Sequence, residues 1–149
     1  MTGSRARSWA TLAALLTFTA LHGRAVAGEP GPAERQGLAR VADVWIDLAR
    51  WCVDHELGAV ARACVERARA AQPVAEELAR AAADCPDAGR EADQQRLRKR
   101  EASAAKQAAG LWDRLAALAA QEGAPERAAR YRLDALETAA ILVGADTPG

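Results

Sequence analysis

Residues 38–52 read LARVADVWIDLARWC, and this stretch decides the fold class of the chain. Its apolar side chains recur in steps of three and four residues, at Leu38, Val41, Ala42, Trp45, Leu48, Ala49 and Cys52. Such steps place side chains on one face of an α-helix. We therefore predict a helix from about Pro32, which suits a first helical turn, to about His55, with a turn at 56–59.

The rest of the chain carries helical patterns interrupted by proline, glycine and aspartate. A second helix must end before Pro73, because proline lacks an N–H and disfavours helical geometry just before it. Pro73 then opens a third helix to about Ala83, and residues 84–87 form a break in which Asp84 is available as a cap. The remaining predicted elements are a polar helix over 88–107 with a break at Gly110, a helix over 111–121, a turn over 122–125 and a helix over 126–143.

Composition excludes several protein classes. Alanine supplies about a quarter of the residues while β-branched and aromatic residues are scarce, which favours helices over strands. The first 27 residues contain three basic residues, Arg5, Arg7 and Arg24, and no acidic one. The rest of the chain therefore has 17 basic and 20 acidic residues, a net charge of about −3. This balance disfavours binding to nucleic acid. The basic run 96–100 has acidic neighbours, and we interpret it as a solvated helix face.

The first 27 residues have the order of a secretory signal peptide. Arg5 and Arg7 precede an apolar stretch over 9–21, which is too short to span a bilayer, and small residues occupy positions 25 and 27. We predict cleavage after Ala27 and a secreted or periplasmic protein. The predicted organisation is a signal peptide (1–27), a tether (28–32), a helical domain (33–143) and a flexible tail (144–149).

Two segments of the chain match at a constant offset of 67 residues. The matched residues, which we predict to form the core, are Trp45, Leu48, Ala49, Ala61 and Ala68 in the first copy and Trp112, Leu115, Ala116, Ala128 and Ala135 in the second. This arrangement of Trp, Leu and Ala, with Pro73 after the first copy, resembles the tetratricopeptide repeat. The resemblance covers about 42–73 and 109–140 and implies antiparallel helical hairpins in a right-handed array. A middle unit over 74–109 would complete three units, and a small helical bundle is the alternative.

The resemblance also implies a binding groove. In tetratricopeptide arrays the first helix of each pair lines a concave surface that binds extended peptides or partner helices. The groove residues implied here are Asp43, Ile46, Arg50, Val53 and Asp54, with Asp113 and Gln121 from the second copy. Arg50 and Asp54 would supply directional contacts. The alternative is an Arg50–Asp54 ion pair on a solvent face.

Three cysteines follow residue 27, in a compartment that we expect to be oxidising. One disulfide and one free thiol would result. The pair Cys52–Cys64 is preferred because a helical hairpin would bring both together, and Cys64–Cys85 and Cys52–Cys85 are the other possible pairs. Cys52 and His55 also share a helix face, so a zinc site completed by Cys64 and Cys85 is a less favoured alternative.

The sequence offers little for catalysis or cofactor binding. His55 is the only histidine after residue 27, and Ser103 lies in a polar helix without a glycine turn to present it. We therefore predict no enzyme activity, no cofactor and no catalytic residue. The expected function is an exported adaptor or scaffold that binds an unidentified protein or peptide, with no transmembrane segment after the signal peptide. The alternative is a self-associating structural bundle of the cell envelope, a homo-oligomer.

Overall fold

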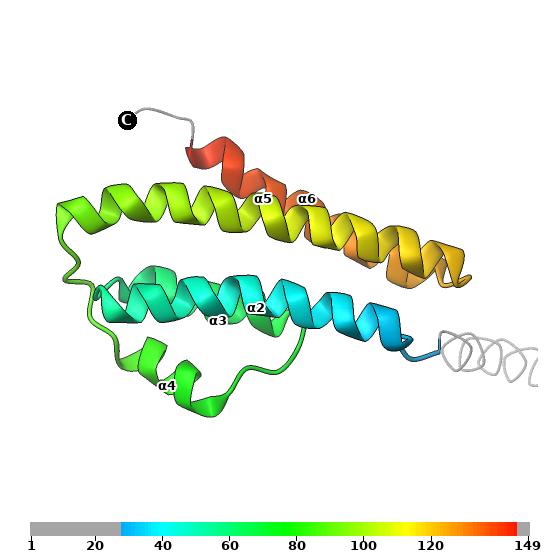
Figure 1. Cartoon of the computed structure of the whole chain (residues 1–149), viewed down its shortest axis with the longest axis horizontal. Helices are drawn as coiled ribbons and strands as arrows, with labels where there is room; N and C mark the ends of the chain where they lie inside the picture. Colours follow the sequence, from blue (N-terminus) through cyan, green and yellow to red (C-terminus); the bar gives the residue numbers. More distant parts are fainter. Residues whose placement is uncertain (1–27, 146–149) are drawn as a thin grey trace, which may run out of the picture.

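The structure is a computed structural model that describes residues 28–145, and this part of the chain consists of helices and connecting segments (Figure 1). An all-α fold is thereby confirmed. The predicted signal peptide and the predicted tail from residue 146 onward lie outside the described residues. The helices are α2 (Pro32–Asp54), α3 (Gly58–Arg69), α4 (Glu76–Asp84), α5 (Glu91–Gln121) and α6 (Pro125–Ala145).

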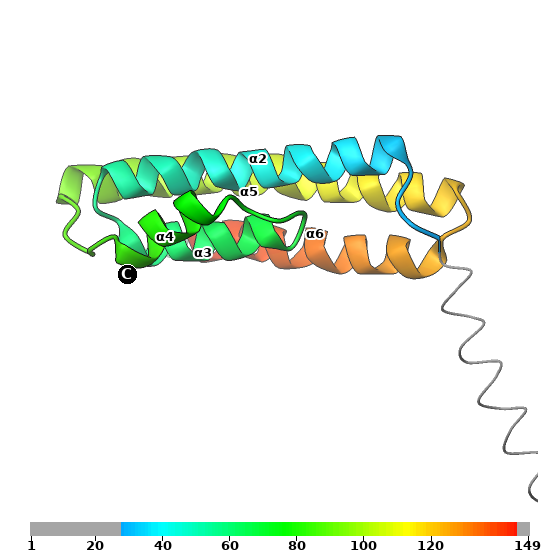
Figure 2. The ribbon, with the colours of Figure 1, turned by 90° about the horizontal axis from the view of Figure 1, so that it is seen from below.

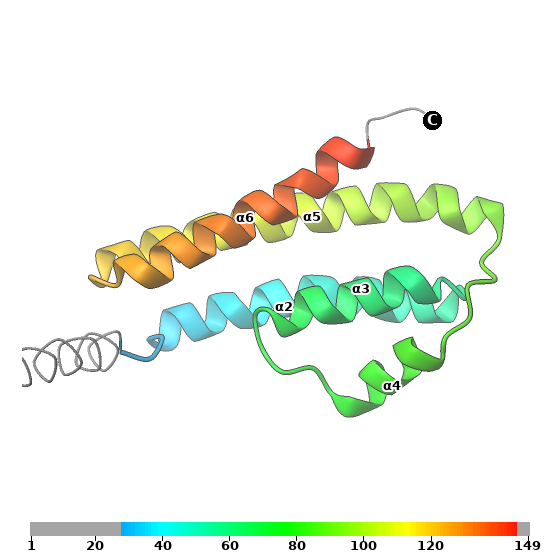
Figure 3. The same cartoon turned by 180° about the vertical axis from the view of Figure 1, so that it is seen from behind.

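Two antiparallel hairpins make up the body of the structure. Helices α2 and α3 form one hairpin and α5 and α6 the other, and α2 packs along α5 to join them. Figure 2 shows α3 and α6 on the same side of the α2–α5 pair, and Figure 3 shows this side from the front. The short helix α4 packs against α2 and α3. The arrangement agrees with both architectures expected from the sequence, a helical array or a bundle.

The core consists of the apolar stripes of the long helices. All ten residues matched between the two copies are buried, and both tryptophans are at most 2% exposed. Alanines let the helices approach closely. A Cβ atom at Gly37 would lie 2.6 Å from a methyl carbon of Leu115, so glycine makes room where α2 meets α5.

Several predicted boundaries are wrong. Helix α5 is 31 residues long and continues through Gly110, so the predicted break there does not occur. The predicted middle unit over 74–109 therefore does not end as a separate unit. One helical glycine costs only about 1 kcal/mol relative to alanine, which a long packed helix can absorb. Helix α4 begins at Glu76 instead of Pro73. Gly144 belongs to α6 and not to a flexible tail.

The α2–α3 turn is joined to the α4–α5 connection by backbone hydrogen bonds. The N–H of Gly58 donates to the carbonyl of Pro86 (3.0 Å), and that of Ala88 donates to the carbonyl of Glu56 (2.9 Å). Asp87 accepts a hydrogen bond of 2.5 Å from the N–H of Ala59 in the first turn of α3. The cap is thus supplied from a distant segment, whereas Asp84, the predicted cap, is the last residue of α4.

Replacement of Gly58 by alanine will destabilise the protein. The added Cβ atom would lie 2.1 Å from the backbone oxygen of Cys85, which cannot move without breaking the contact between the two segments. We expect a loss of about 1–3 kcal/mol in the free energy of unfolding, measured by urea denaturation. Gly110→Ala is the matched control, because nothing lies within 4 Å of its Cβ position. Gly110→Ala should raise the free energy of unfolding by about 0.5–1 kcal/mol. If both variants changed the free energy of unfolding in the same direction, the steric explanation would be contradicted.

A buried carboxylate ties the start of α2 to the start of α6. Glu34 is fully buried, and Arg127 donates to its two oxygens at 3.1 and 3.0 Å. The Tyr131 hydroxyl donates a third hydrogen bond at 3.0 Å. Burial raises the pKa of Glu34, but the hydrogen bonds from Arg127 and Tyr131 and the positive charge of Arg127 help to outweigh burial, and the pKa of Glu34 is lowered below 4.5. Burial and the bond to Glu34 raise the pKa of Tyr131 to about 12.

Candidate functional site

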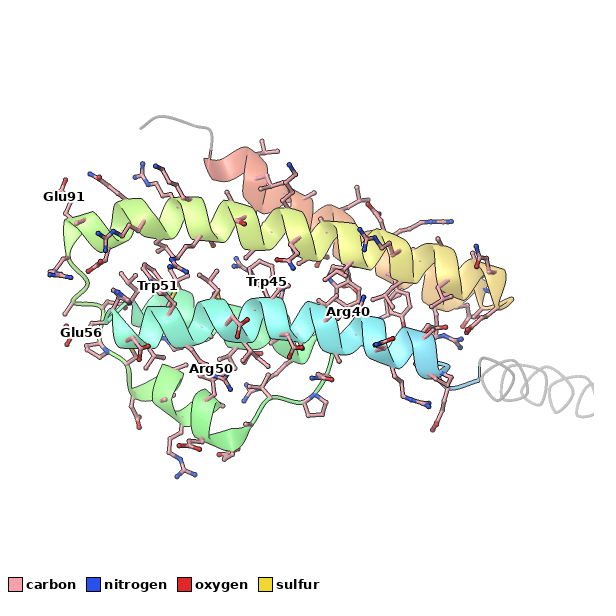
Figure 4. The ribbon with its side chains drawn as sticks, viewed as in Figure 1. Arg40, Trp45, Arg50, Trp51, Glu56 and Glu91 are labelled. Atoms are coloured by element: carbon pink, nitrogen blue, oxygen red, sulfur yellow. The ribbon has the colours of Figure 1, made fainter. Side chains whose placement is uncertain are left out.

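A groove of about 860 Å³ runs between α2 and α5. Arg40, labelled on α2 in Figure 4, lies on the α2 side of this groove. The two helices that form the groove are the longest of the described chain, with 23 and 31 residues. It is lined by Arg40, Asp43, Val44, Asp47 and Leu48 of α2 and by Arg100, Ser103, Ala104, Lys106, Gln107, Gly110, Leu111 and Arg114 of α5.

The groove combines apolar surface with small residues. Val44, Leu48 and Leu111 supply the larger apolar side chains, and each of them also belongs to the core or packs against it. Gly110 lines the same groove without a side chain, and a Cβ atom there would have no neighbour within 4 Å. The space directly beside Gly110 is therefore open.

The charge of the groove is predominantly positive. Arg40, Arg100, Lys106 and Arg114 line it, against the acids Asp43 and Asp47. Among the described residues none of these four cations forms an ion pair, although most other arginines of α3, α4 and α5 do. Cations without an ion-pair partner are available to a negatively charged ligand.

An aromatic side chain lies beside the cationic groove. The guanidinium of Arg100 lies 4.7 Å from the centroid of the Trp51 ring, a distance typical of a cation–π contact. Trp51 also stacks on His55, with 4.2 Å between ring centroids. Figure 4 shows Trp51 near one end of α2, on the side that faces α5. The contact orients Arg100 without neutralising its charge.

The structure spreads the implied groove residues over several surfaces. Asp43 lines the α2–α5 groove, whereas Asp54 lines a separate hollow with His55. Ile46 and Val53 are half-buried against the core. Figure 4 shows Arg50 on the side of α2 that faces α4, and its partner is Asp47 at 4.0 Å instead of Asp54. The last two candidates, Asp113 and Gln121, are exposed on α5.

Sequence reasoning missed the cations of the groove. Lys106, Gly110 and Arg114 follow one another at four-residue steps, so their common helix face was visible in the sequence. The sequence did not show which helix lies opposite that face, because a polar face has no apolar pattern that would identify α2 as its neighbour. Arg100 belongs to the basic run that we interpreted as solvated, and it lines this groove.

The three cysteines are buried free thiols, so the predicted disulfide is absent from the structure. Cys52 is nevertheless close enough to Cys64 to act on it: the interaction with Cys52, together with burial, raises the pKa of the Cys64 thiol strongly. Cys85 donates to the carbonyl oxygen of Val53 at a sulfur–oxygen distance of 3.8 Å. The hairpin thus brings together the two cysteines that we predicted to pair.

The described residues show no grouping suited to a metal ion. Over residues 28–145, no three His, Cys, Asp or Glu side chains are placed to share one ion. The Nδ1 atom of His55 lies 2.7 Å from the backbone oxygen of Trp51, so this ring nitrogen is engaged in a hydrogen bond to the backbone. Over the same range, no helix combines the length and apolar character needed to span a bilayer.

Comparisons with family models, with curated proteins and with solved structures find no match to this chain.

Proposed function

We propose that the protein is an exported, non-catalytic adaptor that binds an acidic, partly apolar segment of a partner protein in the α2–α5 groove. The observation that carries the proposal is the set of four cations without ion-pair partners along one elongated groove. The signal-peptide pattern of residues 1–27 supports its placement in the cell envelope or outside the cell. The pattern of Trp, Leu and Ala that resembles tetratricopeptide repeats supports a role in protein binding.

The chemistry of the groove favours an acidic helix or extended segment with apolar residues on one side. Carboxylates of the segment would pair with Arg40, Arg100, Lys106 and Arg114, since arginine binds carboxylates with two parallel hydrogen bonds. Apolar side chains would contact Val44 and Leu111. Nucleic acid is a poorer candidate, because the acids Asp43 and Asp47 lie in the same groove and would repel phosphates.

The proposal can be tested with displayed peptides. We expect selection of random 15-residue peptides on the purified protein to enrich acidic sequences with apolar residues at helical or alternating spacing. For an enriched peptide, Lys106→Glu/Arg114→Glu should raise the Kd at least about ten-fold in fluorescence anisotropy, because two attractive charges become repulsive. Binding should also weaken as salt is added.

A matched control separates the groove from the overall charge. Lys99→Glu/Arg132→Glu makes the same change in charge at exposed positions that do not line the groove, and it should leave the Kd within about two-fold. Gly110→Leu should block the groove by size while keeping every charge. An equal loss of binding in the control, or selection without acidic enrichment, would refute the proposed function.

A further inference from the structure

Helix α6 carries an exposed apolar stripe on its outer surface. The large apolar residues that are well exposed in the described chain are Leu133, Leu136 and Val143, at 60%, 68% and 73%, and all belong to α6. Exposed alanines at 129 and 140 extend the same line. The positions 129, 133, 136, 140 and 143 follow steps of four, three, four and three residues.

These steps are those of a helix that pairs with another helix. Apolar residues alternating at three and four residues form the seam of two-stranded helix packing. The inner face of α6 is already used, since Tyr131 and Ala135 are buried against the rest of the protein. The outer stripe is therefore additional to what the fold requires.

We propose that this stripe is the contact surface between two copies of the chain, with α6 packed antiparallel against α6 of the second copy. In this arrangement Leu133 faces Leu136 of the second copy, and Ala129 faces Ala140. The helix dipoles oppose one another favourably. Arg130 of each copy lies beside Glu137 of the other, so the dimer gains two symmetric ion pairs.

The charges beside the stripe favour a second copy over a lipid surface. Arg130 and Arg132 flank it together with Glu126 and Glu137, which are all exposed, so there is no excess of positive charge for anionic headgroups. One short helix pair covers less than the roughly 800 Å² per partner of a standard interface, so the dimer should be reversible. The lining of the α2–α5 groove contains no residue of α6, so this inference does not depend on the proposed function.

Sedimentation velocity of the purified protein tests the proposal. The mean mass should rise toward that of two chains between about 5 and 500 µM, as expected for a small interface. Leu133→Gln/Leu136→Gln should weaken the dimer at least about ten-fold, while the circular dichroism of the monomer stays unchanged because both side chains are exposed. A monomer at every concentration would overturn the proposal.

Charge exchange tests the orientation of the two helices. Glu137→Arg alone should weaken the dimer, because Arg130 of the second copy then meets a like charge, and Arg130→Glu/Glu137→Arg should restore it. Restoration by Arg132→Glu/Glu137→Arg instead would overturn the antiparallel arrangement. Binding of the protein to phosphatidylglycerol vesicles through Leu133 and Leu136, without dimerisation, would overturn the proposal and show that the stripe binds a lipid surface.

Discussion

Replacement of Arg127 by methionine will lower the free energy of unfolding by about 3–5 kcal/mol at neutral pH, because it leaves the Glu34 carboxylate buried without its cation. Glu34 is fully buried and the Arg127 side chain is 18% exposed, so water can replace little of the lost interaction. Methionine keeps the length of the side chain, which limits the loss of packing. Urea denaturation followed by circular dichroism measures the effect. Arg132→Met, at an exposed position of the same helix, should change stability by less than about 0.5 kcal/mol.

The loss should depend on pH, with a sign that follows from Glu34. In the natural protein the folded-state pKa of Glu34 is lowered, so its contribution is present above pH 4.5 and is lost as the pH falls through the folded-state pKa. In Arg127→Met, burial dominates and raises this pKa, so the folded variant takes up a proton as the pH falls. The difference in stability between the two proteins should therefore shrink in acid. A difference that is constant from pH 7 to pH 3 would contradict the role of the charged pair.

Replacement of Trp45 by alanine will also cost about 3–5 kcal/mol, the range for truncation of a large buried aromatic side chain. Trp45 is 1% exposed, and the Arg67 guanidinium lies 4.9 Å from its ring centroid. The surrounding core is rich in alanine, whose short side chains cannot fill the cavity. Total stabilities are about 5–15 kcal/mol, so the variant should be close to unfolding at 37 °C. The same expectation applies to Trp112, which stacks on Tyr131 with 5.6 Å between centroids.

Trp51→Ala is the matched control for the buried tryptophans. Trp51 is half-buried, and its described ring contacts are with His55 and Arg100. We expect a loss of about 1 kcal/mol, the sum of a stacking and a cation–π contact at a partly exposed site. Losses of equal size at Trp45 and Trp51 would show that the Trp45 ring does not fill the core.

Local patterns predicted the helices better than the contacts between them. The stripe from Leu38 to Cys52 placed α2 within a residue or two of its observed ends, because burial of one face requires that periodicity. Gly110 misled the prediction because the penalty for a helical glycine is small against the packing of a long helix. Glu34 lies seven residues before Val41, on the apolar stripe itself, but its charge concealed its burial.

The sequence by itself determined the all-α class, the positions of most helices and the burial of the matched Trp, Leu and Ala residues. These properties follow from spacing along one helix, which any reader of the chain can measure. Only the tertiary structure decided that Arg127 reaches Glu34, that Asp87 caps α3 and that α2 and α5 form a cationic groove. Each of these joins residues at least 28 positions apart, and a polar side chain carries no periodic signal that identifies a distant partner. The groove is such a product of packing, because its cations lie on two helices whose polar faces meet only after the apolar faces are buried.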